Sequence, residues 1–138
     1  MRRADERGQV TVLVLGMALI VFAVAGVAVD GTRAWLLRRS LQNAADAAAL
    51  AGAGEIDRAA YYASGGSIVR LDPAASEAVA ARWLEQRGLD ARASIASSAE
   101  RVAVEMRTEL DTTFLALIGV QRLEVAAEAD AAPAPETP

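Results

Sequence analysis

An uninterrupted run of apolar residues stands near the start of the chain. From Val10 to Val29 the sequence carries no charged residue. As an α-helix this segment would extend about 30 Å, which is the hydrocarbon thickness of a bilayer. A helix that is apolar on every side needs lipid or a large protein around it, and the remaining chain is short. The pattern therefore predicts a transmembrane helix over residues 10–29. Its expected anchor residues are Val10, Leu13, Leu15, Leu19, Ile20, Phe22 and Val29.

Two fates are open for this segment. Ala23-Val24-Ala25 fits the A-x-A pattern of a signal-peptide cleavage site, and cleavage near Ala25 would release a secreted soluble binding module. The full apolar length, the two acids ahead of it and the helical pattern beyond Val29 favour retention as an anchor. Three Arg residues precede the segment and three follow closely, so charge alone does not decide its orientation. Because the tail of residues 1–9 is short, we expect it in the cytoplasm and the larger domain outside.

The helix is expected to continue past the membrane over residues 30–57, which are rich in Ala, Leu and Arg, with Gly54 as a stop. Small residues recur along it at spacings of three and four. Such a seam lets another helix approach closely. It can pack on the chain's own distal domain, on a partner helix, or on both at different heights along the helix. The candidate helix-packing seam consists of Ala34, Leu37, Leu41, Ala44, Ala48 and Ala51. The candidate membrane-interface residues are Trp35, Arg33, Arg38 and Arg39.

The distal part reads as a small α+β domain. Residues 58–71 contain Gly65-Gly66 and no clear period, which indicates a loop. Within residues 72–130, Asp72-Pro73 opens a helix that Gly88 ends. Alternating patterns then predict a hairpin over 91–97 and 101–107, a short helix over 111–119 and a third strand over 123–129. The Pro-rich tail, residues 131–138, is expected to be disordered.

Composition removes most catalytic chemistries. The chain has no His, no Cys and no Lys, so no Ser has a His or Lys to activate it, and the usual metal ligands are missing. The net charge of −4 is concentrated in the distal half, which argues against nucleic-acid binding. We therefore expect no enzyme activity: no catalytic, cofactor-binding or metal-binding residues, no cofactor and no small-molecule substrate.

The N-terminal third carries a recognisable combination of residues. It has Arg7-Gly8-Gln9, the apolar span, Asp30 just after the span, the pair Arg38-Arg39, and an Ala-rich run over 41–51. This string resembles TadG-like (TadE/TadG-related) proteins of the Flp/Tad pilus-assembly system, of the short actinobacterial type. The resemblance implies a non-catalytic, single-pass plasma-membrane protein with its domain outside the cell. Its implied partners are the lipid bilayer and other pilus-assembly or pseudopilin-like membrane proteins.

Two departures limit what the resemblance implies. Related pseudopilins are cut after a Gly and carry Glu at the fifth position beyond it, but counting from Gly8 that position is Leu13. This argues against processing at Gly8. Larger TadG proteins carry an Asp-x-Ser-x-Ser metal motif, which this sequence lacks, so we expect no metal-dependent adhesion.

Overall fold

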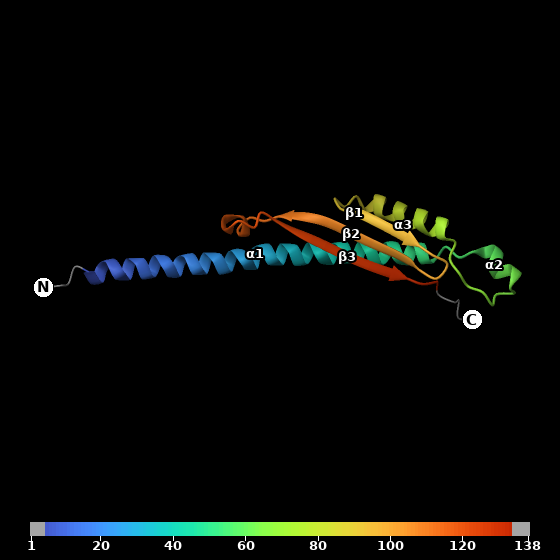
Figure 1. Ribbon diagram of the computed structural model, residues 1–138, viewed down its shortest axis with the longest axis horizontal. Helices are drawn as coiled ribbons and strands as arrows, with labels where there is room; N and C mark the ends of the chain where they lie inside the picture. Colours follow the sequence, from blue (N-terminus) through green and yellow to red (C-terminus); the bar gives the residue numbers. More distant parts are fainter. Residues whose placement is uncertain (1–4, 134–138) are drawn as a thin grey trace. The chain divides into compact units, whose positions relative to one another are not determined.

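The computed structural model describes residues 5–133 of the chain (Figure 1). It confirms the predicted α+β class, with a long N-terminal helix and a three-stranded antiparallel sheet. The elements in chain order are α1 (Asp5–Ala53), α2 (Arg58–Ala63), α3 (Pro73–Arg87), β1 (Arg92–Ser97), β2 (Val102–Asp111), the 3-10 turn η1 (Leu115–Ile118) and β3 (Arg122–Ala131).

The described residues form two compact units. The first contains α1 up to Trp35 together with Leu110–Leu123, and the second contains Leu36–Glu109 together with the segment from Glu124 onward. The turn between β2 and β3, which the sequence placed in the distal domain, therefore groups with the first half of α1. Helix α1 already includes Asp5, inside the predicted 1–9 tail, while residues 1–4 and 134–138 of the two predicted tails lie outside the described range.

In the second unit, the strands lie in the order β1-β2-β3. Ile95 pairs with Val104 and Ser97 with Val102, so the predicted hairpin is confirmed. Alternate residues of β2 are buried, as expected for a strand with one face on the core. Helix α3 packs against β1, and the Ser76 hydroxyl donates to the Gly52 carbonyl of α1 at 2.9 Å. The core residues are Leu41, Ala44, Ala45, Ala48, Ala49, Ala53, Leu71, Ala80, Val102, Val104, Met106, Val125 and Ala127.

Helix α3 has the termini that its sequence predicts. The Asp72 side chain accepts from the Ala75 N–H at 3.2 Å, and Pro73 occupies the first helical position. Gly88 ends the helix with φ of 59°, a left-handed conformation that glycine adopts without a Cβ clash. The expected stop of α1 is also confirmed, since the helix ends at Ala53, directly before Gly54.

The predicted loop over 58–71 is wrong at its start, where α2 forms. Asp57 caps this six-residue helix by accepting from the Ala60 N–H at 3.0 Å. The same carboxylate accepts two bonds from Arg70, from Nη2 at 2.7 Å and from Nε at 3.0 Å. The Ala60 N–H and the Arg70 guanidinium lower the pKa of Asp57. A helix this short, with no buried side chain, leaves no readable period in the sequence.

The expected short helix over 111–119 is also corrected. The predicted helix begins at Asp111, but Asp111 is the last residue of β2. Thr112 continues the hairpin, because its N–H donates to the Gln121 carbonyl at 3.0 Å and its hydroxyl donates to the Val120 carbonyl. Only the four residues of η1 are helical, and Gly119 closes the turn with φ of 97°. Strand pairing from both sides therefore leaves too few residues for an α-helix.

Candidate functional site

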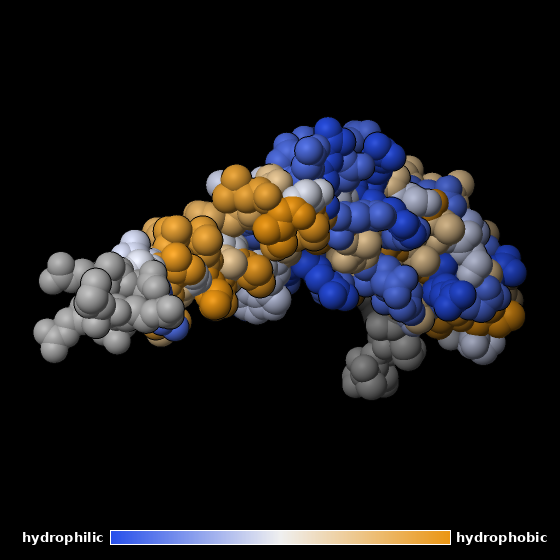
Figure 2. All heavy atoms as spheres, turned by 60° about the vertical axis from the view of Figure 1, so that its left-hand side comes forward, coloured by the Kyte–Doolittle hydropathy of each residue, from blue (hydrophilic) through white to orange (hydrophobic). Residues whose placement is uncertain are grey.

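The first half of α1 exposes its large apolar side chains. In residues 10–29 these are 45–71% exposed, and only 6% of the most apolar window is buried within the chain. All seven predicted anchor residues are among the exposed ones. Among the described residues, one helix is long and apolar enough to cross a membrane, and it contains this segment. Figure 2 shows the hydrophobic surface of this helical segment.

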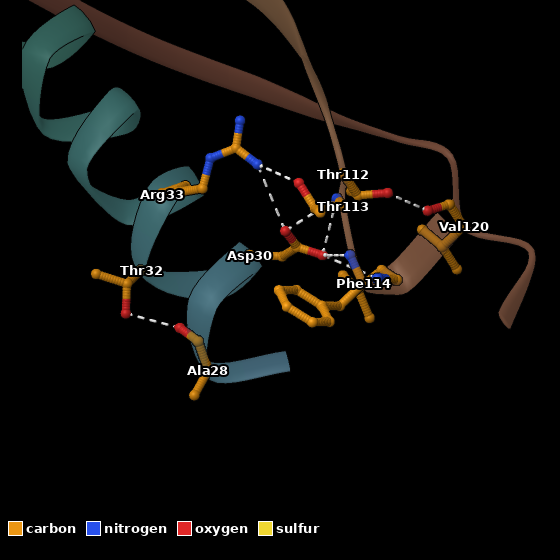
Figure 3. Close-up of polar contacts among 9 residues, drawn as sticks. Ala28, Asp30, Thr32, Arg33, Thr112, Thr113, Phe114 and Val120 are labelled. Carbon is orange, nitrogen blue, oxygen red and sulfur yellow. Dashed lines mark hydrogen bonds and ion pairs between the residues drawn. The ribbon is translucent and has the colours of Figure 1, made fainter. Parts of the chain in front are cut away.

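Asp30 lies immediately after the apolar segment and is completely buried. Its carboxylate accepts from the Thr113 N–H at 3.0 and 3.2 Å, from the Phe114 N–H at 2.8 Å and from the Leu115 N–H at 2.8 Å (Figure 3). Backbone N–H groups that point at one carboxylate stabilise its ionised form. We call this arrangement, Asp30 with residues 113–115, the aspartate clasp.

Arg33 completes the polar side of the clasp. It lies one helical turn after Asp30, and its Nη1 is 3.6 Å from Asp30 Oδ1. The same Nη1 donates to the Thr113 hydroxyl at 2.9 Å. Figure 3 shows Asp30 and Arg33 pointing from the helix toward the turn that carries Thr113 and Phe114. The clasp therefore joins α1 to the turn through one helix carboxylate and one helix cation.

A glycine makes room for the turn next to the clasp. A Cβ placed on Gly26 would overlap the Cβ of Phe114 and lie 2.8 Å from its Cγ. Since Cβ is the rigid root of the Phe114 side chain, it cannot swing away as a flexible tip could. Gly26 is one helical turn before Asp30, so Phe114 packs on α1 about 6 Å nearer to its N-terminus than the clasp.

The N-terminal segment is similar to a known protein family. Residues 8–55 match the family model described as putative Flp pilus-assembly TadE/G-like. This segment is TadE/G-like. The resemblance drawn from the sequence is thereby confirmed over these residues, and the match supports involvement in Flp/Tad pilus assembly. No curated protein and no solved structure matches the chain.

The TadE/G-like segment uses its small-residue seam mainly inside the chain. Leu41, Ala44 and Ala48 are buried in the core of the second unit, whereas Ala34, Leu37 and Ala51 are half-buried. The close approach that small residues permit is seen at Gly52, where an added Cβ would lie 2.9 Å from the Ser76 carbonyl oxygen. Leu41, Ala44 and Ala48 therefore pack on the chain's own domain, and contact of the rest of the seam with a partner helix stays a prediction.

The four candidate interface residues all have exposed side chains. Trp35, Arg38 and Arg39 lie on α1 beyond the apolar segment. The Arg33 guanidinium donates to Thr113 and lies beside Asp30 in the clasp. Their contact with lipid stays a prediction.

The aspartate clasp itself was missed by reasoning from the sequence. Asp30 was noted only as part of the family pattern, although a lone acid that directly follows an apolar run was a usable signal. The family match suggests a structural, non-catalytic role. The clasp agrees with that role, because the Asp30 oxygens already accept bonds from three backbone N–H groups. Within the described residues, no cluster of three or more acidic side chains is arranged to hold a metal ion.

Proposed function

We propose that this chain is a non-catalytic, single-pass component of Flp/Tad-type pilus assembly in the plasma membrane. The observation that carries the proposal is the coincidence of two features in one helix. Its residues 8–55 are TadE/G-like, and its residues 10–29 expose an apolar surface long enough to span a bilayer. Exposed apolar side chains of this size and number are unfavourable in water and favourable in lipid.

The proposed orientation places the N-terminus in the cytoplasm and the small domain outside. Its support is the match of residues 8–55 to TadE/G-like proteins, because the resemblance implies this orientation. Retention of the segment is supported by the continuity of α1, which runs through Ala25 without a break and packs on Phe114 at Gly26. In this orientation Trp35, Arg33, Arg38 and Arg39 follow the span on its outer side.

The proposed mode of action is contact rather than chemistry. Because the centre of the small-residue seam is covered by the chain's own domain, it is not available to a partner helix. Partner helices would instead meet the exposed apolar segment within the membrane, where close packing drives association. The distal domain offers a second surface to neighbouring pilus-assembly or pseudopilin-like proteins outside the membrane.

Location and orientation can be tested together because the chain has no natural cysteine. Glu100→Cys places an exposed thiol in the turn between β1 and β2, and Gln9→Cys places one at the other end of the span. In intact cells, a membrane-impermeant maleimide should label the Glu100→Cys protein at full length in the membrane fraction, and the Gln9→Cys protein only after lysis. A shortened, soluble labelled product would instead support the secreted binding module released near Ala25. The reverse labelling pattern would contradict the proposed orientation.

Involvement in assembly is tested by pilus formation. Cells that lack this chain should produce fewer or no pili by electron microscopy, and re-expression should restore them. A chimera in which residues 10–25 are replaced by an unrelated apolar sequence of equal length keeps Gly26 and the clasp. If the span makes partner contacts, this chimera should insert but fail to restore pili. Normal piliation without the chain would contradict a role in assembly.

A further inference from the structure

The turn between β2 and β3 has an unusual composition. Residues 114–120 read Phe-Leu-Ala-Leu-Ile-Gly-Val and contain no polar side chain, whereas Thr112-Thr113 and Gln121-Arg122 flank them. Leu117 is 84% exposed and Ile118 is 71% exposed, and Phe114 and Val120 are also exposed. We call residues 114–120 the apolar turn. Of these side chains, Leu117 and Ile118 are the most exposed, so most of their apolar surface is not buried within the described chain.

The clasp fixes the apolar turn at the membrane end of α1. Residues 113–115 are bonded to Asp30, the first residue after the apolar segment, and Phe114 packs on Gly26, which lies within that segment. The exposed surface of the apolar turn therefore adjoins the exposed apolar surface of residues 10–29. Both belong to the same compact unit.

Charged groups lie at the base of the apolar turn, where it joins the strands and α1. Asp30 and Arg33 pair at the clasp, and Arg122 Nε lies 3.3 Å from Asp111 Oδ1 where the two strands meet the turn. The residues that directly flank the turn, Thr112-Thr113 and Gln121-Arg122, are thus polar, and the turn between them is apolar. This is the boundary expected for an element that meets lipid with its tip and water with its strands.

The backbone of the apolar turn also suits an apolar environment. In hydrocarbon, each unpaired N–H or C=O group is costly, so an irregular segment must bond its polar groups internally. Three N–H groups of residues 113–115 are taken by Asp30. Within the turn, the N–H groups of Leu117, Gly119 and Val120 donate to carbonyls of the same turn at 3.0–3.1 Å. A buried carboxylate that binds the N–H groups at the start of the turn thereby lowers the cost of placing it in lipid.

We propose that the apolar turn inserts into the bilayer beside α1 and gives the chain a second contact with lipid. Its occupant is the acyl-chain region of the leaflet next to Asp30. This inference rests on the proposed membrane anchoring, because the apolar segment of α1 sets the level at which the turn lies. The clasp then has a role that a single-pass anchor does not need: it holds a hairpin tip at the membrane surface.

Spin-label accessibility tests the proposal in the full chain. Single-cysteine variants Leu117→Cys, Leu19→Cys and Glu100→Cys carry a nitroxide on the apolar turn, in the middle of the span and at the far turn of the sheet. All three replace exposed side chains, so we expect the fold to be kept, as circular dichroism would verify. The proteins are placed in phosphatidylcholine vesicles, and collisions are measured with oxygen, which concentrates in lipid, and with a water-soluble nickel chelate.

The expected result is a Leu117 label that collides with oxygen more than with nickel, as the Leu19 label does and the Glu100 label does not. A Leu19 label in lipid with a Leu117 label open to nickel would overturn the insertion while leaving the anchor intact. A Leu19 label open to nickel would refute the anchor and the insertion together. The Leu117 label could also be shielded from nickel by a second copy of the chain. In that case the shielding would disappear when the protein-to-lipid ratio is lowered, and this result would also overturn the proposal.

Discussion

The two halves of α1 have the same backbone and opposite surfaces. Residues 10–29 carry exposed Val, Leu, Ile and Phe side chains and are covered only where Phe114 packs at Gly26, whereas residues 41–53 bury a face made largely of alanine. Large side chains gain the most where the surroundings are fluid lipid, while alanine and glycine suit a place where another element must come close. The comparison shows that the two halves differ in side-chain size as well as in hydropathy.

The largest effect is expected when a charge is placed on the buried alanine face of α1. Ala48→Arg places a guanidinium where the exposed fraction is 0%, which combines overpacking with an unpaired buried charge. We expect a cost of more than about 3 kcal/mol, enough to unfold a small domain. The measurement is protease resistance of the distal domain in detergent micelles. The matched control is Leu50→Arg on the exposed face of the same helix, for which we expect a change within about 0.5 kcal/mol. Equal sensitivity of the two variants would contradict the burial described.

A second substitution releases the turn without unfolding the distal domain. Asp30→Ala removes the acceptor of three backbone N–H groups, so hydrogen exchange at Thr113, Phe114 and Leu115 should accelerate to that of an open turn. Exchange in β2 at Val104 should change little. Asp46→Ala is the control, because Asp46 is an exposed acid of the same helix whose side chain accepts from Gln42 and lies far from the clasp in the sequence. Unchanged protection of residues 113–115 would show that the clasp does not hold the turn.

Gly26→Ala should have a smaller effect at the same place. The added methyl would overlap the Phe114 Cβ, and overpacking of this kind costs about 1–3 kcal/mol, against a gain of about 1 kcal/mol in helix propensity. We expect a partial acceleration of exchange at Phe114. Gly31→Ala has open space around its Cβ and should leave the turn protected while strengthening the helix. If both variants behaved alike, Phe114 would not be packed on α1.

The smallest effect concerns Asp57, which lies outside both halves. Because its folded pKa is lowered, Asp57 stabilises the fold above its ordinary pKa, and this contribution is lost as the pH falls through the lowered value. Asp57→Asn should therefore lower the unfolding midpoint at neutral pH and converge with the unmodified protein in acid. Thermal melts of both proteins across the acid range measure this. A difference that grows toward low pH would contradict the sign.

Local signals predicted much of this molecule. The caps of α3, the stop of α1 and the β1–β2 hairpin are each encoded within a few residues, as Asp72, Gly54 and the alternation around Val104 show. The clasp could not be predicted in this way, because Asp30 and Thr113 are separated by 83 positions and meet only through the fold. For the same reason, the seam's two alternatives could not be separated from its spacing. Burial of Ala44 and Ala48 depends on what packs against them.

The distance in sequence between Asp30 and its hydrogen-bond partners also sets the order of events during synthesis. At about 5–20 residues per second, Thr113 is synthesised roughly 4–17 s after Asp30. During that interval the apolar segment has emerged and can enter the bilayer, but the N–H groups that complete the Asp30 site do not yet exist. The nascent chain must carry an unmatched carboxylate directly after the apolar segment until the β2–β3 hairpin has been synthesised. The clasp therefore closes late in synthesis, when the β2–β3 turn first bonds to α1.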